Sequence, residues 1–148
     1  MNLVKIKESF FQECQRKGTD SELMYNENGR PNVLIVRLKY KGAFRKFVVP
    51  LRSNISGRAP SWQYFSLPPN QNTAMGNHHG IHYIKIFPIS DRYVDNYLIN
   101  TPFDLMVKGI IDAHEAEIVN ACQNYLNQCE NGNKHFMTPD IDGILQWL

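Results

Sequence analysis

The stretch of the chain that most constrains its fold covers residues 30–53. Two apolar runs, at residues 33–36 and 47–49, flank a short turn at residues 40–43 that contains a glycine. Two apolar runs around a short glycine-containing loop are typical of a β-hairpin. The sequence therefore predicts a sheet organised around this hairpin.

Alternation along the first strand of this hairpin predicts a basic face. Successive side chains of a strand point to opposite sides. On this pattern Leu34, Val36 and Leu38 fall on one side of the strand, and Arg37 and Lys39 fall on the other. We expect the side with the cations to face solvent.

The second strand is expected to end in a polar corner. A proline, Pro50, follows its apolar run, and Leu51, Arg52 and Ser53 come next. On this interpretation these three residues leave the sheet and bring a cation and a hydroxyl to its edge. The functional site is predicted where the basic face meets this corner.

The central segment of the chain contains no acidic residue. Residues 28–90 carry nine Lys or Arg and no Asp or Glu, whereas acids outnumber bases both before and after this segment. The net charge of +2 conceals this separation. A block of one sign attracts polyanions, and interleaved aromatic residues favour a nucleic acid as the partner. The alternative is a solvated cationic sheet face.

The remaining segments are expected to add strands and helices around the hairpin. Further strands are predicted at residues 2–7, 61–67 and 81–87, with an exposed loop at residues 68–80. Helices are predicted at residues 8–17, 91–98, 101–130 and 139–148. The predicted class is α+β in one domain of residues 1–148, with an antiparallel, partly barrel-like sheet surrounded by helices, one of them long.

Other features of the sequence favour a cytoplasmic protein. No stretch approaches the roughly 20 apolar residues that a membrane span needs. The first residues lack the pattern of a secretory signal. Cys14, Cys122 and Cys129 are an odd set without a Cys-x-x-Cys pair, so we expect buried or partly buried free thiols.

The order of these features resembles that of the type III toxin–antitoxin endoribonucleases, the ToxN/AbiQ/CptN family. In that family a strand leads into a Pro-Leu-x-Ser corner whose serine supplies the key hydroxyl, and Ser53 stands at that position here. A strand that ends in Pro-Ile, here Pro88 and Ile89, and a Thr-Pro-Phe sequence at residues 101–103 are also similar. The resemblance covers most of the chain.

Some positions differ from the family pattern. Arg52 stands where relatives often have a small hydroxyl, and a lysine that follows the serine has no counterpart, since Asn54 and Ile55 stand there. Arg30 takes the place of a lysine that precedes the hairpin in some members. The correspondence with the family's functional residues is therefore firmest for Ser53.

The resemblance implies a fold similar to the Kid/MazF-type toxins and RNA cleavage without a metal or other cofactor. It also implies inhibition by a small repeat RNA, folded for example as a pseudoknot, which the toxin itself processes. Toxin and RNA would form a closed protein–RNA hetero-oligomer, and cellular mRNA would be the substrate. Such toxins serve phage defence by abortive infection.

Metal-independent RNA cleavage assigns roles to particular side chains. The 2′-hydroxyl of the substrate attacks the phosphorus, so the protein must help remove its proton, hold the charged phosphorane and protonate the leaving 5′-oxygen. Arg30 and Arg52 suit the phosphorane, because guanidinium matches phosphate oxygens. Ser53 can position the phosphate, and His82, on a predicted strand, is the best candidate acid or base.

The other histidines receive structural interpretations. His78 and His79 are expected in the exposed loop, and His114 in the buried stripe of the long helix. A zinc site at the histidines of residues 78–82 is an alternative, although no cysteine or carboxylate lies nearby to complete four ligands.

The predicted function is a sequence-specific endoribonuclease that leaves 2′,3′-cyclic phosphate and 5′-hydroxyl ends, as the toxin of a type III system. Two alternatives stay open: a protein-neutralised mRNA interferase of type II, and a noncatalytic RNA-binding module. The candidate RNA-binding residues are Tyr25, Arg37, Lys39, Lys41, Arg45, Lys46, Arg58, Trp62 and Lys85.

Overall fold

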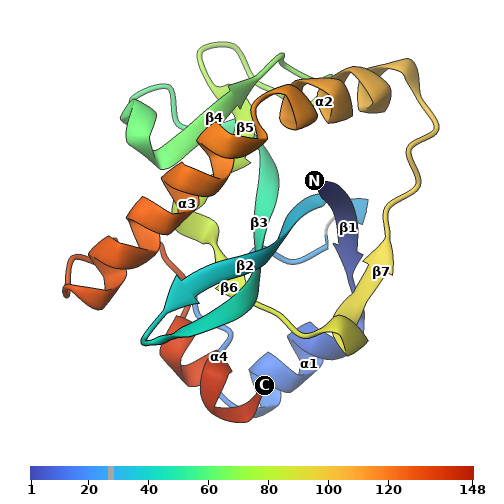
Figure 1. The fold of residues 1–148 in the computed structure, drawn as a ribbon. Helices are drawn as coiled ribbons and strands as arrows, with labels where there is room; N and C mark the ends of the chain where they lie inside the picture. The colour runs from blue at the N-terminus through green and yellow to red at the C-terminus, as the bar shows by residue number, and fades with distance from the viewer. Residues whose placement is uncertain (27–28) are drawn as a thin grey trace.

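Figure 1 shows the computed structural model of the chain, which describes residues 1–26 and 29–148. Its strands are β1 (Asn2–Ile6), β2 (Asn32–Tyr40), β3 (Ala43–Ile55), β4 (Tyr64–Leu67), β5 (His78–His82), β6 (Phe87–Pro88) and β7 (Val94–Asn96). Its α-helices are α1 (Glu8–Arg16), α2 (Pro102–Ala113), α3 (Glu115–Glu130) and α4 (Ile141–Trp147). Single-turn 3₁₀ helices lie at Ser61–Gln63, Tyr83–Lys85 and Asp91–Tyr93. The predicted α+β class is confirmed.

The strands form one antiparallel sheet in the order β4-β5-β3-β2-β1-β7, with β6 also paired to β3. Among the described residues no pairing joins β4 to β7, so the sheet is open and the partly barrel-like arrangement is wrong. The reason lies in the central hairpin, which buries apolar side chains on both faces. Phe47 and Val49 face one hydrophobic core, and Val48 faces the other. A strand that is buried on both faces has a continuous apolar run.

The helices cover these two faces. Side chains of α2 and α3 pack into the first core, and side chains of α1 pack into the second. The short α4 contributes Ile141 to the first core and Ile144 to the second. In Figure 1, α2 and α3 run along one side of the sheet, and α1 and α4 lie together at the opposite end. Because helices pack on both faces of the sheet, the sheet does not close into a barrel.

The central hairpin is confirmed, but its first strand contains a β-bulge. Its tight turn has Lys41 and Gly42 at φ of 49° and 80°, as a two-residue hairpin turn requires. The register between β2 and β3 shifts between Ile35 and Leu38. The bulge turns Val36 outward, where it is 61% exposed. The predicted common face of Leu34, Val36 and Leu38 is therefore wrong.

The second strand of the hairpin is longer than predicted. Strand β3 pairs with β2 as far as Pro50, and from Leu51 onward it pairs with β5 instead. Proline lacks the N–H that a ladder needs, and here it stands where the strand changes partner. Ser53 therefore lies inside β3, and the prediction that residues 51–53 leave the sheet is wrong.

Two other predicted strand and loop segments differ from the structure. The expected strand at residues 81–87 is interrupted by the 3₁₀ turn at Tyr83–Lys85, and β5 begins earlier, at His78. The end of the expected loop is therefore a strand. Gly80 suggested a loop, but it is a strand position where a side chain does not fit: a Cβ there would lie 2.2 Å from the Phe65 carbonyl oxygen.

Two predicted helices also differ. Residues 91–98 form a 3₁₀ turn and then β7, whose pairing with β1 outweighs local helix preference. The long helix is divided at His114 into α2 and α3. Its start is confirmed, because the Thr101 Oγ1 caps it by accepting a hydrogen bond from the Asp104 backbone N–H at 3.0 Å.

Two general features complete the fold. In the part of the chain that the structure describes, no helix is long and apolar enough to cross a membrane. Cys14 and Cys122 are buried and Cys129 is partly buried, as the sequence predicts.

Candidate active site

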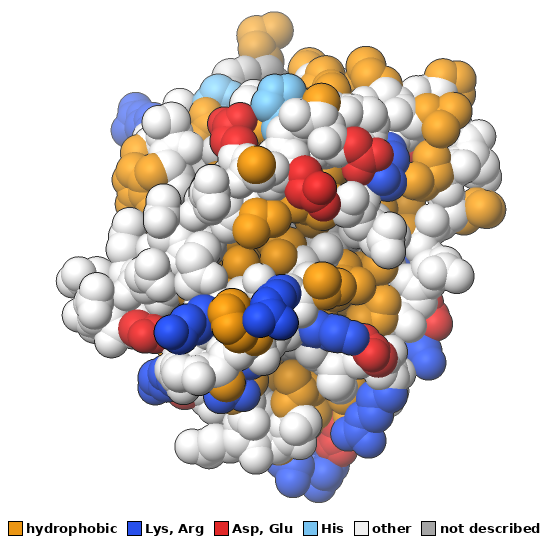
Figure 2. All heavy atoms as spheres, in the orientation of Figure 1, with side chains coloured by type: hydrophobic (Ala, Val, Ile, Leu, Met, Phe, Trp, Pro, Cys, Tyr) orange, Lys and Arg blue, Asp and Glu red, His pale blue; other side chains and the backbone are white. Residues whose placement is uncertain are grey.

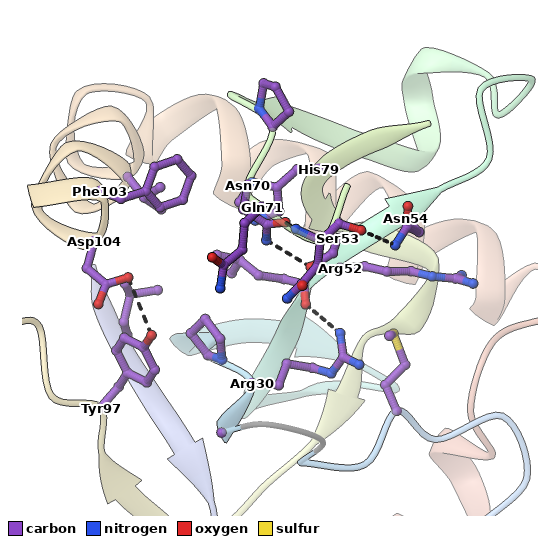
Figure 3. A pocket seen from close by; sticks show the side chains of 18 of the residues that line it. Arg30, Arg52, Ser53, Asn54, Asn70, Gln71, His79, Tyr97, Phe103 and Asp104 are labelled. Atoms are coloured by element: carbon purple, nitrogen blue, oxygen red, sulfur yellow. Dashed lines mark hydrogen bonds between the residues drawn. The ribbon is translucent and has the colours of Figure 1, made fainter. Parts of the chain in front are cut away.

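A cavity of about 960 Å³ opens beside the second half of β3. Its lining comes from residues 51–54 of β3, the loop before β2, the loop at residues 69–72, and the start of α2 (Figure 3). Ser53, Arg30, Arg52 and Tyr25 are among the residues that line it. The structure therefore brings together four residues that the sequence analysis singled out.

The hydroxyl of Ser53 is held by an asparagine from the neighbouring loop. The Asn70 Nδ2 donates a hydrogen bond to the Ser53 Oγ at 2.8 Å. The Asn70 Oδ1 accepts from the Thr73 hydroxyl at 3.0 Å and from the Asn72 backbone N–H at 2.9 Å, which fixes the orientation of the amide. Because Ser53 accepts from Asn70, its own O–H can donate to a ligand in the cavity.

The loop that carries Asn70 is tied to β3 by the residue after Ser53. The Asn54 Nδ2 donates to the Asn72 carbonyl at 2.8 Å, and the Asn54 Oδ1 accepts from the Ala74 backbone N–H at 2.7 Å. The Asn77 amide donates to the same oxygen at 3.3 Å. Asn54, which departs from the family pattern, thus anchors one wall of the cavity.

Arg30 connects β3 with the loop before β2. Its Nη1 donates to the Leu51 carbonyl at 2.8 Å (Figure 3). Its Nε donates to the Tyr25 carbonyl at 3.2 Å. A guanidinium can make both bonds at once because its donors form a rigid fork. Arg30 therefore fixes its own position and that of Tyr25 relative to the strand that carries Ser53.

Tyr25 is also held from the other side. Its hydroxyl donates to the Asp20 carboxylate at 3.2 Å and accepts from the Gln15 amide at 3.3 Å. Its ring lies 5.1 Å from the ring of Phe11, centre to centre. The aromatic ring is thus presented to the cavity by α1 and the loop that follows it.

His82 lies outside the cavity lining. Its side chain is only 2% exposed, and its Nδ1 has no hydrogen-bond partner among the described residues. Burial, together with the nearby cations Arg52 and Lys85, lowers its pKa to about 3. His82 is therefore neutral near pH 7, and its predicted role as acid or base stays a prediction.

His79 lines the cavity, and the sequence analysis missed it. Its side chain is buried, and its Nδ1 lies 2.7 Å from the Pro68 carbonyl oxygen. Since a carbonyl only accepts, Nδ1 carries the proton and Nε2 is the acceptor. Burial lowers the pKa of His79, so the ring is neutral near pH 7. Little in the sequence signals this strand, because His79 and Gly80 precede Ile81 without apolar alternation and Gly80 favours a loop.

The other histidines have separate surroundings. The His78 ring stacks on Tyr64 with centres 5.0 Å apart. His114 is exposed, so its predicted burial is wrong; it lies where the helix is divided, with its ring 5.2 Å from that of Phe65. No group of three His, Cys, Asp or Glu in the described residues could hold a metal ion.

Three lysines of the acid-free segment are paired with acids from outside it. Lys41 lies 3.0 Å from the Asp142 carboxylate, Lys46 lies 2.7 Å from Asp91, and Lys85 lies 2.8 Å from Glu22. The Lys85 side chain is only 6% exposed. In the folded chain, carboxylates from the flanking segments thus lie next to cations of the acid-free segment.

The remaining candidate RNA-binding residues lie on the outer surface. The Arg37 guanidinium lies 4.0 Å from the centre of the Phe44 ring, and Lys39 and Arg58 are exposed. Figure 2 shows basic side chains gathered over the β2–β3 hairpin, with acidic side chains at the edges of this band. The candidates that do not line the cavity are Arg37, Lys39, Lys41, Arg45, Lys46, Arg58, Trp62 and Lys85.

The fold has been seen before in solved structures, although sequence comparison alone does not find it. No protein-family model matches the chain, and no curated protein has a significant sequence match. One similar structure is that of AbiQ, a lactococcal anti-phage endoribonuclease of the type III toxin–antitoxin system. It is 14% identical with a TM-score of 0.70, and the match covers 99% of this chain and 94% of AbiQ.

Two further structures match over almost their whole length. One comes from a bacterial antiviral system that a processed non-coding RNA regulates; it is 20% identical with a TM-score of 0.70, covering 99% of this chain and 96% of the other. The second comes from a bacterial type III system whose toxin is selectively inhibited by a non-coding RNA pseudoknot. It is 13% identical with a TM-score of 0.71, and the match covers 99% of this chain and 96% of the other. Over its full length, this chain has the fold of the type III toxin–antitoxin proteins.

Proposed function

We propose that this chain is a metal-independent, sequence-specific endoribonuclease, the toxin of a bacterial type III toxin–antitoxin system that acts on RNA in the cytoplasm. One observation carries the proposal: the Ser53 hydroxyl is oriented by Asn70 in a cavity that Arg30 and Arg52 also line. The match to the lactococcal anti-phage endoribonuclease over the whole chain supports the same conclusion.

The cavity supplies groups for two parts of the reaction, which are removal of the 2′-hydroxyl proton and stabilisation of the phosphorane. The substrate's 2′-hydroxyl attacks the adjacent phosphorus, and the 5′-oxygen leaves, so that the products are a 2′,3′-cyclic phosphate and a 5′-hydroxyl. The Ser53 O–H donates to a phosphate oxygen, and Arg30 and Arg52 stabilise the negative charge of the phosphorane. His79, neutral and with Nε2 as its acceptor, takes the proton of the 2′-hydroxyl, and the leaving 5′-oxygen takes up a proton from solvent water to become the 5′-hydroxyl.

The surface cations serve a different purpose from the cavity. Arg37, Lys39 and Arg58 are exposed and do not line it. They provide a path for the phosphates of a folded antitoxin RNA whose cleaved end occupies the cavity. An RNA bound by each of its ends to a different toxin copy would close protein and RNA into a ring.

The decisive experiment is cleavage of RNA by the purified protein in the presence of EDTA, with chemical analysis of the ends. We expect 2′,3′-cyclic phosphate and 5′-hydroxyl ends, and almost no cleavage by the Ser53→Ala variant. Ends with 5′-phosphate, or a strict requirement for Mg²⁺, would overturn the mechanism. Binding without any cleavage would instead identify a noncatalytic RNA-binding module.

The class of antitoxin requires a separate observation. Tandem short repeats ahead of a terminator, upstream of the coding sequence, would indicate an RNA antitoxin, as proposed. A small reading frame at that place would indicate a protein antitoxin and hence a type II system.

A further inference from the structure

The wall of the cavity opposite Ser53 carries a carboxylate. Asp104, in the first turn of α2, is the only acidic residue among the described residues that line the cavity. Its Oδ1 accepts a hydrogen bond from the Tyr97 hydroxyl at 3.4 Å. In Figure 3, Asp104, Tyr97 and Phe103 stand together on one side of the cavity, and Arg30 and Ser53 stand on the other.

The position of Asp104 is fixed by the start of the helix. Its backbone N–H donates to the Thr101 Oγ1 at 3.0 Å. An acid in the first turn stabilises a helix through the helix dipole, and that role alone requires neither a tyrosine partner nor a place in a cavity. A carboxylate beside a phosphate-binding site repels phosphate, so this side of the cavity suits another part of RNA.

The two side chains offer one acceptor and one donor. An ionised carboxylate only accepts hydrogen bonds, and a phenol can donate. Burial, with Asp104 nearby, raises the pKa of Tyr97, so its hydroxyl keeps its proton near pH 7. The two oxygens lie 3.4 Å apart, which is long for an O–H···O bond. A ligand that bonds to both oxygens therefore breaks only a weak hydrogen bond.

We infer that Asp104 and Tyr97 are specificity-determining residues that bind the base edge of a nucleotide next to the scissile phosphate. An amino N–H of the base donates to Asp104, and Tyr97 donates to the neighbouring ring nitrogen. Adenine and cytosine present this pair on their Watson–Crick edges. Uracil and guanine present a ring N–H beside a carbonyl oxygen, so they can bond to the same two side chains only in the other register, with the ring N–H donating to Asp104 and the carbonyl accepting from Tyr97.

An aromatic ring lies beside this pair. Phe103 precedes Asp104 in the chain, lines the same cavity and packs against His79, with ring centres 6.0 Å apart. A base that bonds to Asp104 can stack on this ring, and such stacking tolerates every base. Phe103 therefore contributes affinity, and the Asp104–Tyr97 pair contributes the choice of base. The inference rests on the proposed function, because it requires RNA as the substrate.

The test compares base preference in matched variants. A randomised RNA library first locates the cleaved bond, and short RNAs that differ at one neighbouring position then give kcat/KM for each base. The wild type should discriminate between the two registers, with adenine and cytosine in one and uracil and guanine in the other, by roughly ten- to a hundredfold, which corresponds to two good hydrogen bonds. Asp104→Asn should reduce this preference to a few-fold, and Tyr97→Phe should reduce it in part.

The control is Asp95→Asn, which changes an exposed acid on β7 that does not line the cavity. It should keep the wild-type preference. Thermal unfolding checks that each variant is folded. If Asp104→Asn disrupts α2, Tyr97→Phe still tests the pair, because it removes one hydroxyl only.

A binding experiment separates this inference from the proposed function. In the Ser53→Ala background, fluorescence anisotropy with the same short RNAs should show the same base preference, and its loss in Asp104→Asn. Cleavage with an unchanged preference in Asp104→Asn, or a wild type that cleaves equally with all four bases at this position, would overturn the inference alone. Base-selective binding through Asp104 by a protein that never cleaves would overturn only the proposed function.

Discussion

Replacing Ser53 by alanine should greatly slow cleavage and leave the fold nearly unchanged. Among the described residues, the Ser53 Oγ makes one hydrogen bond, accepted from the Asn70 Nδ2 at 2.8 Å. Both side chains are partly exposed, so water can replace the lost acceptor. One such bond contributes about 0.5–1.5 kcal/mol to the free energy of unfolding. The loop stays attached through the three hydrogen bonds of Asn54.

The two effects of this substitution differ greatly in size. A loss of about 1 kcal/mol lowers the Tm of a domain of this length by about 2–4 °C. Loss of a donor that stabilises charge in the transition state slows the reaction by about 10²–10³-fold. Cleavage should therefore be slowed by about 10²–10³-fold in a protein that is folded at the assay temperature.

The assay measures both quantities on the same samples. Thermal unfolding gives the Tm, and single-turnover cleavage of a short RNA in EDTA gives the rate. Ser66→Ala is the matched control, since Ser66 is exposed on β4 and does not line the cavity; it should cleave at the wild-type rate. A Ser53→Ala variant that cleaves as fast as the wild type would refute the assignment. A fall in Tm far beyond 4 °C would instead show that Ser53 is structural.

Three further predictions concern the histidines and the surface cations. His79→Gln should slow cleavage by about 10²–10⁴-fold, as expected for a general base, without loosening RNA binding; an unchanged rate would remove it from the mechanism. His82 has a pKa of about 3 in the folded protein against about 6.5 unfolded, so its contribution to stability is full above pH 6.5 and is lost as the pH falls. Urea unfolding should therefore show about 2 kcal/mol less stability at pH 5 than at pH 7.5 from this group, and His82→Gln should remove that difference. Replacing Arg37 and Lys39 together by Ala should weaken binding of the antitoxin RNA and flatten its dependence on salt, measured as affinity against salt concentration; equal slopes would place the RNA elsewhere.

The elements that sequence predicts best here are those with local signals. The hairpin has a glycine turn between apolar runs, α1 has its apolar residues at helical spacing, and α2 begins with Thr101 and Pro102. Each of these signals acts over a few residues, and the structure confirms each element. Errors occur where a distant partner decides the conformation. Residues 94–96 become a strand because the edge of β1 is available to them.

The candidate site divides in the same way. Ser53, Arg30 and Arg52 could be named from motif and charge, and all three line the cavity. Asn70 could not be identified from the sequence, because it lies 17 residues after Ser53 in a segment without periodicity. His79 was missed because Gly80 looks like a loop signal, whereas the close approach of β4 is what excludes a side chain there. The wall opposite Ser53 was missed because Tyr97 was expected in a helix.

The run of basic residues in the sequence also overstates how many unpaired cations the folded surface carries. Of the nine basic residues in the acid-free segment, Lys41, Lys46 and Lys85 have carboxylate partners from flanking segments. Arg30 and Arg52 line the cavity. Arg37, Lys39, Arg45 and Arg58 are the four that, among the described residues, neither line the cavity nor form an ion pair with a carboxylate. The double substitution of Arg37 and Lys39 removes two of these four cations, so it is the change that tests most directly whether RNA binds to this surface.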